Sequence, residues 1–199
     1  MKKFLVSILI GVMLISSVSA TEFADVKEAD HFYDEVLFAS GKGIINGIGN
    51  NLFNPQGTLT VAEGIKISAC INADFFKKEI KPYDGATHWA DAYYDYAVEN
   101  GIINETDFAK ADFDKAITRD RLFYIFAKTL PDSEFIAINE KDLAPGNNMA
   151  HYIEKLFCAG IVIGTENGFE LDNNIIRADG VILISRMCAY SRRQMVLEE

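Results

Sequence analysis

Two short landmarks recur along this chain at an almost constant interval. The first is a glycine followed by two β-branched apolar residues, and its copies begin at Gly43, Gly101 and Gly160. The interval from the first copy to the second is therefore nearly identical to the interval from the second copy to the third. The second landmark opens the segments that begin at positions 60, 118 and 176, and its two intervals are equal. Two landmarks that keep one period indicate three copies of a single structural unit.

Each copy has the pattern of a helix, a loop and a second helix. In the second copy, apolar and aromatic residues follow a helical spacing from Trp89 to Ala97, and Gly101 stands where a left-handed residue ends a helix. In the first copy, the sequence from Thr60 to Glu63 predicts a capping box. We expect first helices over about residues 31–40, 88–100 and 149–159, and second helices that begin near positions 60, 118 and 178.

The second helix of the third copy is apolar on nearly every side, from Val181 to Met187. Such a helix is buried on nearly every side. A single helix pair of this size cannot cover its own apolar face, whereas three pairs packed around an axis can. We therefore expect a mainly all-α fold, a pseudo-threefold bundle of three units with the second helices in the centre.

The segment 1–20 has the pattern of a secretory signal peptide. Lys2 and Lys3 precede an apolar run from Phe4 to Val18, and small residues lead to Ala20. The alternative is an uncleaved membrane anchor, but the run is shorter than the roughly 20 residues of a spanning helix. We expect cleavage after Ala20, a secreted protein, and no membrane association afterwards.

The charge balance excludes a general attraction to polyanions. The net charge of −10 becomes −12 once Lys2 and Lys3 are removed, which opposes binding to nucleic acid or to an acidic membrane. An anionic ligand must then be held by a local cluster of arginines. The three cysteines and three histidines show no metal-ligand spacing, so we expect no metal and no cofactor. Cys158 and Cys188 either pair or, like Cys70, are buried free thiols.

The order of motifs resembles the surface-layer homology (SLH) domain. The pattern of that family is Phe-x-Asp-Val, His-Trp-Ala, Gly-Ile-Ile-x-Gly, Phe-x-Pro and Thr-Arg-Ala-Glu. The first copy matches at residues 23–26, 43–47 and 53–55. The second copy matches at residues 88–90, 101–103 and 118–119, and the third matches more loosely at residues 142–143, 160–164 and 177–179. The resemblance thus extends over about residues 23–190.

This resemblance implies both an organisation and a function. A signal peptide (1–20) is followed by SLH repeat 1 (21–80), repeat 2 (81–134), and repeat 3 with a C-terminal tail (135–199). Grooves between neighbouring repeats of the family hold an anionic, often pyruvylated, polysaccharide that is linked to peptidoglycan in bacterial walls. We therefore expect a non-covalent cell-wall binding module at the bacterial surface.

The same resemblance gives candidate ligand contacts. Arg119 and Arg177 occupy the arginine position of the family motif, and a forked guanidinium suits a carboxylate. The alternative is that each is a surface arginine paired with a nearby acid. Val61 replaces this arginine in the first copy, which predicts that the groove depending on it is weak or silent. The remaining candidates are an aromatic residue that either lines the groove or packs in the core, two aspartates that either cap a helix or accept sugar hydroxyls, and two loop glycines. They are Trp89, Asp25, Asp84, Gly47 and Gly164.

An alternative function is a secreted SLH-like scaffold whose degenerate grooves bind a protein partner. Val61, Arg121 and Glu105 depart from the family pattern and favour this alternative, whereas Arg119 and Arg177 favour the polysaccharide. No nucleophile–base pair has a known catalytic spacing, so we expect no enzyme activity.

Overall fold

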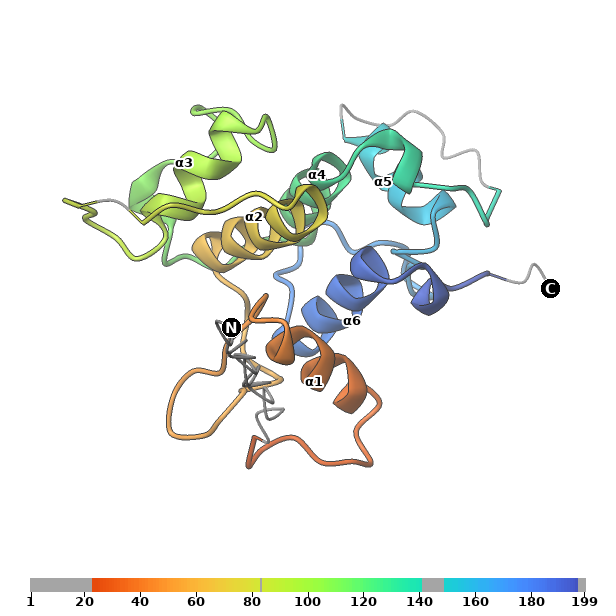
Figure 1. Cartoon of the computed structure of the whole chain (residues 1–199). Helices are drawn as coiled ribbons and strands as arrows, with labels where there is room; N and C mark the ends of the chain where they lie inside the picture. Colours follow the sequence, from red (N-terminus) through yellow and green to blue (C-terminus); the bar gives the residue numbers. More distant parts are fainter. Residues whose placement is uncertain (1–22, 83, 141–148, 197–199) are drawn as a thin grey trace, which may run out of the picture.

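The computed structural model describes residues 23–82, 84–140 and 149–196, and its six α-helices are joined by long loops and short 3₁₀ turns (Figure 1). The first helices of the three units are α1 (Tyr33–Gly41), α3 (Asp91–Glu99) and α5 (Ala150–Cys158). The second helices are α2 (Val61–Phe76), α4 (Arg119–Thr129) and α6 (Arg177–Cys188). The 3₁₀ turns are η1 (Lys110–Asp112), η2 (Asp132–Glu134) and η3 (Tyr190–Arg192). The described residues contain isolated β-bridges but no strand, which confirms the all-α prediction.

The expected helix boundaries follow from local chemistry and are correct to within a few residues. The glycines that follow the first helices have φ angles of +68°, +68° and +69°, a conformation that a side chain resists. These residues are Gly43, Gly101 and Gly160. The capping box of α2 is confirmed, because Thr60 accepts from the amide of Glu63 while the Glu63 carboxylate accepts from the amide of Thr60.

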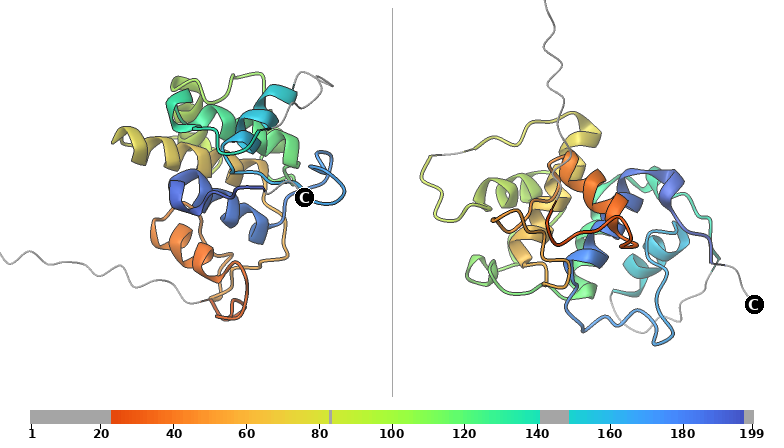
Figure 2. Two further views of the ribbon diagram at one scale, coloured as in Figure 1. Left: turned by 90° about the vertical axis from the view of Figure 1, so that its right-hand side faces the viewer. Right: turned by 90° about the horizontal axis from the view of Figure 1, so that it is seen from below.

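Contacts among the helices run around the molecule in a closed cycle. Helix α3 packs against α2, α5 packs against α4, and α1 packs against α6. Each first helix therefore packs against the second helix of the preceding unit. Helix α1 packs against the second helix of the third unit, which closes the cycle. Figure 1 shows α2, α4 and α6 near the middle with the first helices around them, and Figure 2 shows α1 beside α6 in two further directions.

A ring of three backbone hydrogen bonds joins the units at their centre. The amide of Leu59 donates to the carbonyl of Ile175, that of Ile175 to Ile117, and that of Ile117 to Leu59, at 2.9–3.1 Å. These three residues are fully buried and equally spaced along the sequence. We call positions that share this spacing equivalent. Because every donor finds an acceptor on another unit, the ring satisfies backbone groups that burial would otherwise leave unpaired.

The same cycle appears at the start of each second helix. The amides of Val61, Arg119 and Arg177 donate to carbonyls in the loop of another unit, at 2.8–2.9 Å. Their acceptors are Lys115, Asn173 and Gly57, which are also equivalent. The first turn of a helix has no intrahelical acceptors for its amides, so these bonds both cap the helix and join the units.

Candidate functional site

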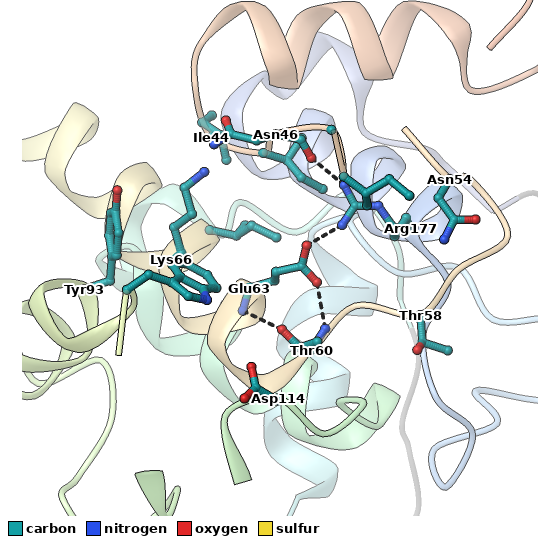
Figure 3. Close-up of a pocket in the computed structure, with 15 residues that line it drawn as sticks. Ile44, Asn46, Asn54, Thr58, Thr60, Glu63, Lys66, Tyr93, Asp114 and Arg177 are labelled. Carbon is teal, nitrogen blue, oxygen red and sulfur yellow. Dashed lines mark hydrogen bonds and ion pairs between the residues drawn. The ribbon is translucent and has the colours of Figure 1, made fainter. Parts of the chain in front are cut away.

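One concavity of the described residues is a pocket of about 610 Å³ that we call groove 1 (Figure 3). Its walls are the loop after α1, the first two turns of α2, the start of α3 and one side chain from α6. All three units therefore contribute to it. The side chains used below that line it are Asn46, Glu63, Lys66, Trp89, Tyr93, Asp114 and Arg177.

The loop wall of groove 1 is held by Asp25 and Gly47. The two carboxylate oxygens of Asp25 accept from the amides of Phe53 and Asn54 at 2.8 and 2.7 Å. A Cβ on Gly47 would lie 2.5 Å from the carbonyl oxygen of Leu52, so only glycine fits there. Of the two roles considered for Asp25, capping of α1 is not observed, because the Asp25 carboxylate binds amides of the groove loop and α1 has no side-chain cap.

The aromatic wall consists of Trp89 and Tyr93, whose ring centroids lie 6.3 Å apart. Trp89 is 52% exposed, which is unusual for the largest apolar side chain. Its backbone is fixed by the buried Asp91, which accepts from the amides of Thr87 and His88 and from Lys110 at 2.8–2.9 Å. The bond from Lys110 and these two amides hold the pKa of Asp91 well below its usual range. An exposed ring on a rigid support suits a platform for a ligand.

Arg177 and Glu63 form the polar end of groove 1. The Arg177 side chain is 1% exposed, and its guanidinium donates to the Glu63 carboxylate and to the carbonyls of Phe53 and Asn46. It also stacks over the Phe53 ring at 4.7 Å. Three acceptors from the first unit thus hold an arginine from the third, so the motif arginine joins two units at the edge of the groove.

Lys66 is the cation that the sequence interpretation missed. It lies one turn after Glu63 on α2, is 8% exposed, and lines groove 1 between the aromatic wall and Asn46 (Figure 3). Burial lowers the pKa of its ammonium. Among the described residues it has no ion-pair partner. When the Asn46 amide is oriented so that its nitrogen donates to the carbonyl of Ile45, its oxygen accepts from the Lys66 ammonium at 3.3 Å.

The second arginine lies in a much smaller pocket of about 160 Å³, which we call groove 3, beside α6. Arg119 donates to the carbonyl of Phe169 at 2.9 Å and to Asp179 at 3.2 Å. These are the equivalents of the contacts that Arg177 makes with Phe53 and Glu63. Gly164 lines the same pocket.

The structure therefore divides the predicted site residues into groups. Gly47, Trp89 and Arg177 meet in groove 1, with Asp25 behind the loop, whereas Arg119 and Gly164 lie in groove 3. Asp84 lies in the exposed turn before α3 and lines neither groove. Asp142, which matched the same family position, falls outside the described residues.

The junction between the first and second units lacks the arginine–acid pair. The equivalent positions carry Val61 and Arg121, so both members of the pair have changed together. Arg121 lies over the Phe108 ring at 4.2 Å and donates to the carbonyl of Asp107 within its own unit. This change could have been read from the sequence, because Val61 precedes Arg121 by the same interval that separates Arg119 from Asp179.

The cysteines of the described residues are free, so Cys158 and Cys188 do not pair, and each is partly exposed and not fully buried. In the described segments, no cluster of histidine, cysteine or acidic side chains is arranged to hold a metal ion. Within those same segments, no helix combines the length and apolar character needed to cross a bilayer.

Together, the six helices and groove 1 form a mainly helical structure with a concave surface. The family model of the S-layer homology domain matches residues 22–63, which include the groove loop and the start of α2. The segment 22–63 is thus similar to the S-layer homology domain, a family of cell-wall binding modules found at the bacterial surface. No curated protein matches the chain.

Proposed function

We propose that this protein binds an anionic polysaccharide of the bacterial cell wall in groove 1. The family match supports a non-covalent attachment to the wall, and the pocket supplies a place for it. The observation that carries the proposal is the exposed Trp89 ring, which lines the same groove as the buried polar side chains Lys66 and Arg177, in a space large enough for a sugar unit.

The chemistry of groove 1 suits a sugar. An aromatic face covers the apolar face of a pyranose ring, and Trp89 with Tyr93 offers two such surfaces. Asn46, Asn54 and Thr58 provide neutral donors and acceptors for hydroxyl groups around the rim. Gly47, where a Cβ would meet the Leu52 carbonyl, lets the loop backbone pack closely in the wall of the groove.

The remaining parts of the family description belong to the same proposal. Residues 21–80, 81–134 and 135–199 are three SLH repeats around a pseudo-threefold axis, which the cyclic hydrogen bonds support. Residues 1–20 are a signal peptide that directs secretion, and the polymer is a pyruvylated one linked to peptidoglycan. The protein then lies at the wall, without catalytic activity.

Co-sedimentation with purified walls tests the proposal. We expect the protein without the segment 1–20 to pellet with walls of the producing bacterium, and to remain in solution once acid has extracted the secondary polymer. Trp89→Ala should weaken pelleting, whereas Phe76→Ala, another exposed aromatic that lies outside groove 1, should not. Equal pelleting with extracted walls, or none with native walls, would contradict the proposal and favour a protein partner.

A further inference from the structure

We infer that Lys66, and neither motif arginine, recognises the negative charge of the ligand, and that the ligand presents a carboxylate to it. This inference rests on the proposed function, because it concerns the same groove. It also implies that the protein holds a charged ligand in one groove only.

Arg177 has little capacity left for a ligand. A guanidinium has five N–H donors, and three acceptors of the first unit already hold Nε and both terminal nitrogens. Its charge is matched by Glu63, which in turn caps α2 through Thr60. Arg119 makes the equivalent pair with Asp179 beside a pocket of only about 160 Å³. The arginine–acid pair therefore forms both in groove 1 and beside the much smaller groove 3. We conclude that its role is to join neighbouring units.

Lys66, in contrast to Arg177, keeps hydrogen-bond donors for a ligand. Its ammonium carries three donors, and the single acceptor among the described residues is a neutral amide oxygen of Asn46. The charged groups around it are accounted for: Glu63 is engaged by Arg177 and Thr60, and Asp114 is 87% exposed at the rim beside His88. A largely buried ammonium without a counter-ion is costly, and an anion that enters the groove relieves that cost.

The equivalents of Lys66 in the other units carry no charge. They are Tyr124, whose hydroxyl donates to Asp107 at 2.5 Å and accepts from Lys128, and Ile182 in groove 3. Arg186, whose equivalent in α2 is the smaller Cys70, also lines groove 3 and narrows it. Its guanidinium donates to the carbonyl of Ile161 at 3.1 Å. Of these three equivalent positions, only the one in groove 1 therefore presents a cation that can accept a ligand's charge.

A carboxylate fits this site better than a neutral sugar. A charge-assisted hydrogen bond to the ammonium is short and about twice as strong as a neutral one. Lys66 is a single cation, so it matches a single carboxylate with the sugar ring against Trp89 and Tyr93. A phosphate also carries negative charge, and the experiment below separates the two.

The experiment measures pelleting of the wild type, Lys66→Gln and Lys66→Arg on native walls and on walls whose carboxylates have been amidated with carbodiimide and an amine. We expect Lys66→Gln to bind native walls about 10- to 100-fold more weakly, the loss of one charge-assisted bond. Lys66→Arg should retain most of the affinity. On amidated walls the wild type should fall to the level of Lys66→Gln. Lys78→Gln, on an exposed lysine outside groove 1, is the matched control and should behave as the wild type.

Several results would overturn the inference. Wild-type binding that survives amidation but is lost after hydrofluoric acid would identify a phosphate. Equal affinity of Lys66→Gln and the wild type for native walls would exclude Lys66. Because amidation changes the walls and leaves the protein intact, a folding defect in a variant cannot imitate its effect. A wild type that pellets with no wall preparation would instead refute the proposed function.

Discussion

Replacing Arg177 by alanine should destabilise the whole molecule far more than the same change at Arg119. Both arginines join two units, but their environments differ. The Arg177 side chain is 1% exposed and its partner Glu63 is 24% exposed, whereas Arg119 and Asp179 are 12% and 45% exposed. Arg177 also has one further carbonyl acceptor. Removing one partner of a buried pair leaves an uncompensated charge, which an exposed pair does not.

The expected magnitudes follow from this difference. Arg177→Ala should lower the free energy of unfolding by about 3–5 kcal/mol. Arg119→Ala should cost only about 1–2 kcal/mol, because water screens the exposed Asp179. In a chain of this size each kcal/mol corresponds to about 2–4 °C in Tm, so Arg177→Ala should melt roughly 6–20 °C below the wild type.

Urea denaturation followed by far-UV circular dichroism at pH 7 measures both changes. The two variants provide matched controls for each other, since they occupy equivalent positions in the repeat. If Arg177→Ala lies within about 1 kcal/mol of the wild type, the guanidinium does not join the units. The repetition of its hydrogen-bond geometry at Arg119 would then need another explanation, and a direct role in ligand binding would regain support.

Three further predictions concern the groove loop, the support of Trp89 and the thiols. Gly47→Ala should lower Tm by an amount that corresponds to about 1–3 kcal/mol, because its Cβ meets the Leu52 carbonyl at 2.5 Å, while Gly41→Ala, with no atom within 4 Å, should be neutral or slightly stabilising. The lowered pKa of Asp91 means that its contribution to stability is complete above the ordinary value of 3.8 and is lost as the pH falls through the lowered value. Asp91→Asn should therefore flatten the acid side of the stability–pH curve measured by urea denaturation, and an unchanged curve would contradict this. Thiol titration of the unreduced, unfolded protein should give three free thiols, and a value of one would show a disulfide.

The fold was predictable because its strongest determinants are local and repeated. Gly43 and its two counterparts end the first helices in the left-handed conformation that the sequence indicated, and Thr60 with Glu63 forms the predicted capping box. The apolar character of α6 likewise predicted its burial, which covers even Arg177 and Arg186. These features depend on neighbours within a few positions, so the sequence alone carries the information.

The site was harder to predict because its walls come from segments far apart in the chain. Arg177 meets Glu63 across 114 residues and the Phe53 carbonyl across 124, so a motif that matched a ligand contact also matched a structural tie. Lys66 stands between two isoleucines on a helix expected to be buried, and only the position of Trp89 on the neighbouring unit shows that it faces a groove. A lone cation in an apolar helical segment was the one available signal.

The fluorescence of Trp89 during titration with purified wall polymer tests the central claim most directly. Trp89 is the sole tryptophan of the chain and lies in groove 1, so its emission reports on that groove alone. We predict a saturable change in emission with one class of site, which is lost when the carboxylates of the polymer are amidated. Polymer that pellets with the protein but leaves the emission unchanged would show that binding occurs elsewhere, and would contradict the assignment of groove 1.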